Sequence, residues 1–247
     1  MTSGKHLTES EIRAYFKCSS FYNFGGLVEP EIGLKIVQDV IEVLTVSSIR
    51  GITKEPLKEI HSALIKAVST YGQQSNLMEP QVERYLNSCL LWLQDFFEIF
   101  SFSTYLPVFG PIEPVIKIDR TSIKLHFAGL YRSEKNSTIH ALSFSPYKTK
   151  HSIVNDPISI LKLELLKPFV KKHFPTNRPQ VKLHTFYYGK NHNMGYVSLD
   201  SNSIPDNTVN NVESQIINMQ NSFHYPVIPC LYSCKYKKTC LPGGINE

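Results

Sequence analysis

Four of the five cysteines in this chain lie near its two ends. Cys18 comes early, and Cys230, Cys234 and Cys240 follow more than 200 residues later. If the two ends meet in the fold, four thiolates at this spacing can hold one metal centre. The fifth, Cys89, stands in an apolar run and is expected to be a buried small hydrophobe.

Three interpretations of the terminal cysteines compete. A [4Fe–4S] cluster is favoured, because its ligands tolerate uneven loops and the split here is one and three. Zinc is the alternative, although structural zinc sites usually bring two close pairs of ligands. Unpaired structural thiols are the third. Disulfides need an oxidising compartment, and the first residues lack the apolar core of a secretory signal, so an intracellular, reduced protein is expected.

The composition is that of an ordinary globular protein. The 247 residues are 42% hydrophobic and 11% aromatic, which suits one large domain spanning 1–247. The most apolar segment, 89–102, is interrupted by polar residues and is too short to cross a bilayer, so no membrane partner is expected. The net charge of +5 permits binding of a polyanion such as nucleic acid without requiring it.

Helical patterns dominate residues 1–110. Thr8 and Glu11 form a capping box at the start of one helix. Apolar residues at helical spacing predict three more helices, over 34–44, from Pro56 to just before Gly72, and from Pro80 to Phe100.

The period then changes, and residues 111–200 are expected to form an α/β core. Asp156 followed by Pro157 predicts the start of a helix within it. Alternating apolar residues predict strands on both sides of that helix, over 115–118, 123–127, 137–148, 181–187 and 195–199. The order is αβββαβ, an α/β fold with a mixed sheet and N-terminal helical additions. Residues 200–221 are expected to be a loop or a weak polar helix, and 222–247 a cysteine-rich end segment.

This order, with cysteines at both ends, resembles the PD-(D/E)XK nuclease superfamily, and in particular its RecB-like, AddB-like and CRISPR-associated exonucleases with an iron–sulfur clamp. LTESEIRAYFKCSSFYNF resembles the entry helix of that family, which ends in the first cluster cysteine. KEIHSALIKAV resembles the helix with a metal-binding histidine, here His61. FAGLYR and SPYKTK resemble the strands with the Gly-x-x-Asp and Asp/Glu-x-Lys motifs, and CLYSCKYKKTC resembles the closing cysteine triplet. The resemblance implies a restriction-endonuclease-like core.

The motif residues that would bind metal are replaced. These nucleases hold Mg²⁺ or Mn²⁺ between two carboxylates, but the motif register places Arg132 and Pro146 at the two carboxylate positions. A guanidinium repels a cation, and a proline side chain offers no ligand. The resemblance therefore implies an inactive nuclease, not an enzyme. His61, Arg132 and Lys148 would then line a vestigial cleft that holds a phosphate directly; alternatively, His61 is a core histidine and the other two are solvated.

Two further sets of residues complete the expected sites. Glu113 and Asp119 are candidates for relocated metal ligands in an active exonuclease. Lys235, Lys237 and Lys238 lie among the terminal cysteines and form either a solvated loop or a weak nucleic-acid contact.

The expected function is that of a catalytically inactive, iron–sulfur, nuclease-like subunit. It would bind nucleic acid, with DNA favoured, or act as a scaffold in a replication, recombination, transcription or packaging complex. The alternatives are a metal-dependent DNA exonuclease and a pure protein-interaction subunit. No small-molecule substrate is expected. The richness in Asn, Ile and Lys is typical of AT-rich genomes, including viral ones.

Overall fold

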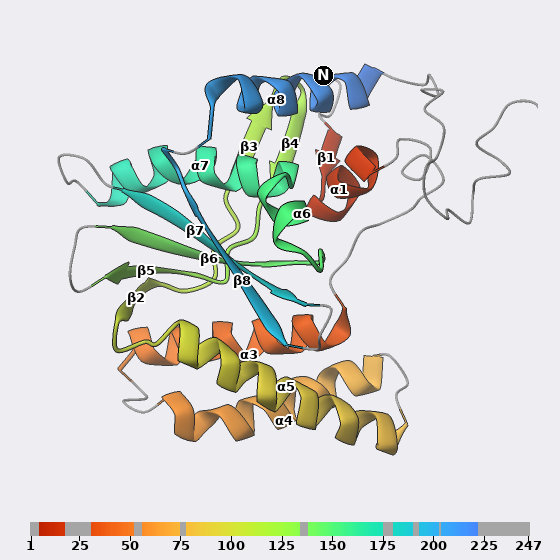
Figure 1. The fold of residues 1–247 in the computed structure, drawn as a ribbon, viewed down its shortest axis with the longest axis vertical. Coiled ribbons are helices and arrows are strands. Elements are labelled where there is room, and N and C mark those ends of the chain that lie inside the picture. The colour runs from red at the N-terminus through yellow and green to blue at the C-terminus, as the bar shows by residue number, and fades with distance from the viewer. Residues whose placement is uncertain are drawn as a thin grey trace, which may run out of the picture.

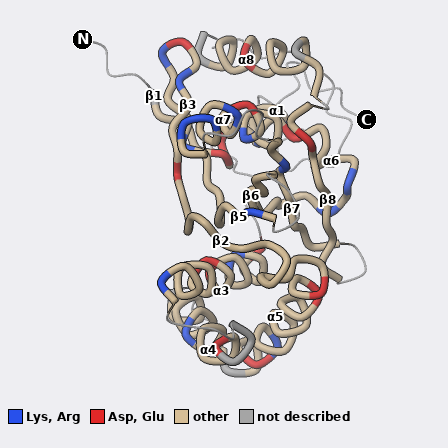
Figure 2. Tube along the Cα trace, turned by 90° about the vertical axis from the view of Figure 1, so that its left-hand side faces the viewer, with Lys and Arg blue, Asp and Glu red and all other residues tan. Residues whose placement is uncertain are grey.

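The protein is a mixed α/β fold, as expected from the sequence. The computed structural model describes residues 5–17, 31–51, 56–74, 78–133, 138–174, 180–189, 193–202 and 204–221. A five-stranded sheet lies between two groups of helices, and a smaller three-stranded sheet lies beside one of these groups (Figures 1 and 2).

The larger sheet is mixed. Its strands, in order across the sheet, are β2 (Tyr105–Phe109), β5 (Gly129–Ser133), β6 (Ile139–Ser145), β7 (Val181–Tyr188) and β8 (Met194–Asp200). β6 and β7 run parallel, and all the other neighbouring strands are antiparallel. Every residue of the central strand β6 is buried, as expected for a strand that is covered on both faces.

The parallel pair is connected by α6 (Lys150–Val154) and α7 (Pro157–His173). The predicted start of α7 is confirmed, because the Asp156 side chain accepts a hydrogen bond from the backbone N of Ile158 at 3.3 Å. This cap fixes the point at which the chain turns onto the face of the sheet.

The smaller sheet corrects the expected assignment of strands. β1 (Lys5–Leu7), β4 (Thr121–Lys124) and β3 (Val115–Ile118) form it, in that order. The predicted strands at 115–118 and 123–127 therefore do not belong to the main sheet. Its first strand is β2, which starts before the predicted boundary at residue 111. The sequence pattern does not predict β2, because Pro107 argues against a central strand. β2 is an edge strand, and its pairing with β5 is irregular between Pro107 and Phe109.

Three helices cover one face of the larger sheet. They are α3 (Ile32–Ile49), α4 (Pro56–Gln74) and α5 (Glu79–Ile99), with α4 packed behind the other two. Their apolar stripes form a core with the sheet that includes Leu93, Phe96 and Phe186. The predicted helices are confirmed, although α4 runs past Gly72.

The opposite face is covered by α1 (Glu9–Lys17), α6 and α7, and α8 (Asp206–Asn221) packs on α7 and on β3. The predicted capping box of α1 is confirmed, since the Thr8 backbone N donates to Glu11 at 2.8 Å and the Glu11 backbone N donates to Thr8 Oγ1 at 3.2 Å. The polar stretch from residue 200 is largely helical. In the described part of the chain, no helix is both long and apolar enough to cross a membrane.

Candidate functional site

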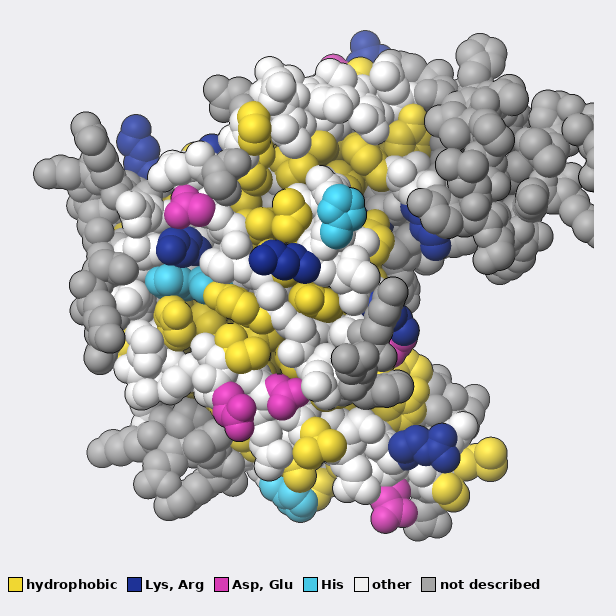
Figure 3. Space-filling view, viewed as in Figure 1, with side chains coloured by type: hydrophobic (Ala, Val, Ile, Leu, Met, Phe, Trp, Pro, Cys, Tyr) yellow, Lys and Arg dark blue, Asp and Glu magenta, His cyan; other side chains and the backbone are white. Residues whose placement is uncertain are grey.

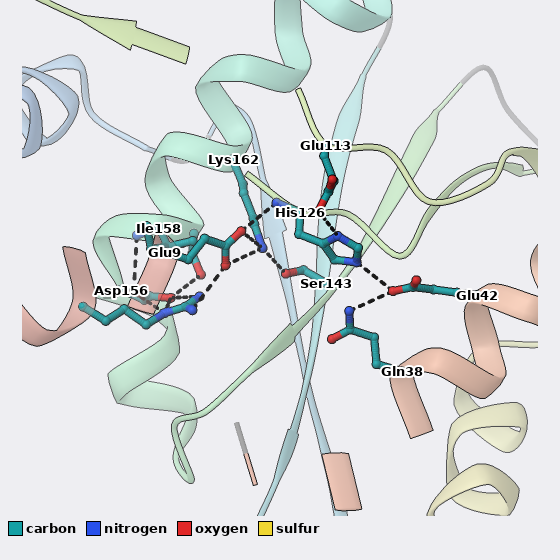
Figure 4. Close-up of polar contacts among 11 residues, drawn as sticks. Glu9, Gln38, Glu42, Glu113, His126, Ser143, Asp156, Ile158 and Lys162 are labelled. Carbon is teal, nitrogen blue, oxygen red and sulfur yellow. Dashed lines mark hydrogen bonds and ion pairs between the residues drawn. The ribbon is translucent and has the colours of Figure 1, made fainter. Parts of the chain in front are cut away.

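A cluster of charged and polar side chains lies between α1, α7 and β6 (Figure 4). We call it the α1–α7 cluster. Its members come from three distant parts of the chain and are Glu9, Arg13, Ser143, Asp156 and Lys162. The side chains of Arg13, Asp156 and Lys162 are only 4%, 0% and 3% exposed, and that of Glu9 is 16% exposed. Burial of this much charge requires close pairing.

Arg13 and Asp156 form the inner ion pair of the α1–α7 cluster. Arg13 Nε donates to the two carboxylate oxygens of Asp156 at 3.3 and 3.1 Å, and Nη2 donates at 3.1 Å. Burial opposes the charge on Arg13, but the nearby Asp156 and Glu9 outweigh it and raise the pKa of the guanidinium. The pair therefore holds α1 against the first turn of α7.

Lys162 connects α7 to both α1 and the sheet. Its Nζ atom lies 2.9 and 3.1 Å from the two carboxylate oxygens of Glu9 and donates to Ser143 Oγ at 2.8 Å. Burial also opposes the charge on Glu9, but Lys162 and Arg13 outweigh it and lower the pKa of the carboxyl. Burial lowers the pKa of Lys162 as well, and Glu9 offsets only part of that effect.

His126 links the α1–α7 cluster to α3. Its backbone N donates to Glu9 at 2.7 Å. Its ring lies between two carboxylates, with Nε2 2.7 Å from Glu42 and Nδ1 3.5 Å from Glu113. Gln38 donates a second hydrogen bond to Glu42 at 2.8 Å. Burial opposes protonation of the ring, but Glu42 outweighs it and raises the pKa of His126.

The opposite face of the sheet carries a pair of buried histidines. His140 Nδ1 lies 2.7 Å from His184 Nε2, and His184 Nδ1 lies 2.7 Å from the Tyr196 hydroxyl. Burial, with a contribution from Lys182, lowers the pKa of His140 to about 4, and burial next to His140 lowers that of His184 to about 3. Both histidines are therefore neutral at pH 7. Within the described residues, His140 Nε2 is buried without a hydrogen-bond partner.

The two positions that the motif register assigns to carboxylates do not face each other. Arg132 is exposed near the end of β5 and pairs with Ile139 at the start of β6. Pro146 follows the other end of β6. At about 3.3 Å per residue, the length of that strand puts about 20 Å between the two positions. They therefore cannot have shared one metal ion.

The remaining residues of the predicted cleft lie on separate elements. His61 is exposed on α4, so the interpretation of it as a core histidine is wrong. Lys148 follows β6, lies 2.6 Å from Glu31 and stands over the ring of Tyr188. Among the described residues, no hydrogen bond or ion pair joins His61, Arg132 and Lys148.

The two candidate relocated ligands are also apart. Glu113 is 47% exposed and pairs with Lys124 and His126. Its hydrogen bond from Lys124 is the main reason that its pKa is lowered. Asp119 is exposed at the β3–β4 turn, where its positive φ of 51° is a backbone conformation that aspartate tolerates better than most residues. The conformation of this turn, and not a metal site, accounts for the aspartate at position 119.

The predicted metal ligands Cys18, Cys230, Cys234 and Cys240 lie outside the described residues, as do Lys235, Lys237 and Lys238. Cys89 is buried as expected, and burial raises the pKa of its thiol to about 12. In the part of the chain that the structure describes, no three His, Cys, Asp or Glu residues are grouped to hold a metal ion.

The sequence contained a signal for the α1–α7 cluster that pattern analysis missed. Lys162 interrupts the apolar stripe of α7, at helical spacing from Ile158 and Leu166. A lysine at such a position needs a buried acid. Glu9 and Arg13 are likewise four residues apart on one helix, where Arg13 follows the buried Ile12. Neither signal identifies the partner, which lies about 150 residues away.

Comparison of the sequence with protein-family models and with curated proteins finds no match.

Proposed function

We propose that this protein is a catalytically inactive, nuclease-like subunit that binds nucleic acid or acts as a scaffold in a larger assembly, with its terminal cysteines holding a [4Fe–4S] cluster. The observation that carries the proposal is the distribution of carboxylates around the sheet. β2, β5, β6 and β7 contain no aspartate or glutamate. The two-carboxylate metal site of the nucleases that the chain resembles stands on neighbouring strands.

On the face of the larger sheet that α7 covers, the acids of the α1–α7 cluster are already neutralised. Glu9 and Asp156 come from α1 and from the N-cap of α7, and their carboxylates contact Arg13 and Lys162. A divalent cation that entered would have to displace a buried base and leave it without a partner, which is costly. The α1–α7 cluster therefore favours a structural role over metal-assisted hydrolysis.

The connectivity of the sheet supports the nuclease-like part of the proposal. β2, β5 and β6 follow one another as antiparallel neighbours, α7 crosses over, and β7 returns parallel to β6. Within this sheet the elements agree with an αβββαβ arrangement, but the strands are not the ones expected, because β3 and β4 of the smaller sheet come between β2 and β5 in the chain. α3, α4 and α5 precede β2 in the chain, and β8 follows β7.

The placement of α1 and α8 supports the iron–sulfur clamp. Both helices pack on α7, and Figure 1 shows the end of α8 on the same side of the molecule as α1. Cys18 directly follows α1, and Cys230 comes nine residues after the end of α8 at Asn221. Nine extended residues span about 30 Å, so the two ends can reach a common centre.

The face drawn in Figure 3 does not gather its basic side chains into one patch. On the face drawn in Figure 3, described Lys and Arg side chains are scattered among acidic and apolar ones. We propose that Lys235, Lys237 and Lys238, which stand among the terminal cysteines in the sequence, contact phosphates.

The experiment is incubation of the iron-loaded protein with labelled single- and double-stranded DNA in Mn²⁺ or Mg²⁺. The proposal predicts that no strand is cleaved and that any retained DNA is released steeply as salt rises. A variant with Lys235, Lys237 and Lys238 changed to Gln should lose retention if the tail binds DNA. Cleavage that Glu9→Gln or Glu113→Gln abolishes would overturn the proposal and establish an exonuclease.

A further inference from the structure

Lys162 Nζ has the surroundings of a bound cation. Three oxygens lie within 3.1 Å of it, two from Glu9 and one from Ser143 (Figure 4). A further hydroxyl lies on the same face of the sheet but does not contact Lys162. Thr185 lies next to Ser143 in the register of β6 and β7, and its buried hydroxyl has no hydrogen-bond partner within the described residues.

The α1–α7 cluster is balanced for one positive charge at this position. Its two acids, Glu9 and Asp156, are matched by Arg13 and Lys162, and Arg13 contacts both acids. Removal of the Lys162 ammonium leaves one negative charge in a buried site. One monovalent cation restores neutrality, whereas a divalent cation leaves an excess positive charge that burial disfavours.

The distances also favour an ammonium ion over a divalent metal ion. Contacts of 2.8 to 3.1 Å are ordinary N–H···O hydrogen bonds. Mg²⁺ needs oxygens at about 2.0–2.1 Å and Ca²⁺ at about 2.3–2.6 Å. Glu9 cannot easily move to meet them, because Arg13 and the backbone N of His126 hold its two oxygens at 3.2 and 2.7 Å.

We propose that Glu9 and Ser143 form a binding site for a small primary ammonium ion, which the side chain of Lys162 permanently occupies. Truncation of Lys162 opens the site to ammonium or methylammonium from solution. The inference depends on the geometry of the described residues and does not depend on the proposed function.

The test is the thermal stability of Lys162→Ala, followed by circular dichroism. Methylammonium or ammonium chloride is compared with sodium and tetramethylammonium chloride at the same ionic strength. The site predicts that the two primary ammonium ions raise the Tm of the variant by about 3 °C or more, and leave that of the wild type unchanged. An equal rise in the wild type, an equal rise with sodium or tetramethylammonium, or a larger rise with MgCl₂ overturns it.

A second comparison decides the matter if Lys162→Ala does not fold. Lys162→Met keeps the apolar stem but leaves Glu9 unpaired, and Glu9→Gln with Lys162→Met removes both charges. The double variant should have the higher Tm and should not respond to ammonium ions, because its site no longer lacks a charge. A double variant no more stable than Lys162→Met contradicts the site. Neither measurement involves DNA, so its failure is distinct from that of the proposed function.

Discussion

The two faces of the larger sheet bury ionisable groups in opposite ways. On the α7 face, Glu9, Arg13, Asp156 and Lys162 are charged and in contact. On the α3 and α5 face, His140 and His184 are kept neutral by burial among aromatic rings such as Tyr105. Burial favours the neutral form in both places, and only a nearby opposite charge reverses it. The difference therefore follows from whether partners were brought from elsewhere in the chain.

The charged face also has a task that the neutral face lacks. It attaches α1, a short helix of 9 residues, to α7 and β6. Apolar contacts alone allow a short helix to slide, whereas Arg13 must meet Asp156 and Glu9 must meet Lys162. We infer that the ion pairs fix the position of α1.

The largest expected effect comes from breaking the charged face at Arg13. Arg13→Met leaves Asp156 buried without its partner, and should lower the free energy of unfolding by about 3–5 kcal/mol. Urea denaturation measures it. The matched control is Lys167→Met, because Lys167 is 39% exposed and pairs with Glu164 on the surface of α7. That change should cost less than about 0.5 kcal/mol; similar losses in the two variants would contradict the comparison.

Acid should selectively weaken the neutral face. The unfolded chain takes up protons near pH 6.5, but folded His140 resists them until about pH 4, so stability falls as the pH drops through this interval. The loss attributable to His140 is about 3 kcal/mol, from 1.4 kcal/mol per pKa unit.

A double variant isolates this loss. His140→Leu with His184→Leu should flatten the stability profile between about pH 6.5 and pH 4, whereas a change of the exposed His151 to Gln should leave it unaltered. A profile that stays as steep in the double variant would show that other groups carry the acid sensitivity.

His126 should show the reverse dependence on pH, with a smaller size. Its folded pKa is raised, so the stability that it contributes is complete below pH 6.5 and is lost as the pH rises through the folded value. The loss should be smaller than that for His140, because the His126 side chain is 30% exposed and solvent screens its ion pair with Glu42. NMR titration of the ring should give a pKa above 6.5, which Glu42→Gln lowers more than Glu113→Gln. A normal or lowered pKa would remove His126 from the charged group.

The parts of the fold that local sequence determines were predictable. Thr8 with Glu11 and Asp156 with Pro157 identify two helix starts, because a cap depends on neighbours within three residues. The ion pairs were not, since Arg13 and Asp156 are 143 residues apart in the sequence. A sequence pattern shows that Arg13 and Asp156 need partners only when the burial of their side chains is already known.

The strand pairing explains why the motif register failed to define a site. A single-sequence motif fixes the spacing between Arg132 and Pro146, but not where the β5–β6 hairpin turns. The observed pairing of Arg132 with Ile139 sets the facing residues, and it turns Ser143 towards Lys162. Register is a property of two strands together, so one strand's sequence leaves it open.

The most direct test is a titration of the full-length protein with Mn²⁺, followed by electron paramagnetic resonance of the free ion. The central claim is that buried bases already neutralise the acids on the α7 face. We therefore predict that the wild type and Glu9→Gln leave the same amount of Mn²⁺ free. A stoichiometric Mn²⁺ site in the wild type that Glu9→Gln abolishes would contradict that claim.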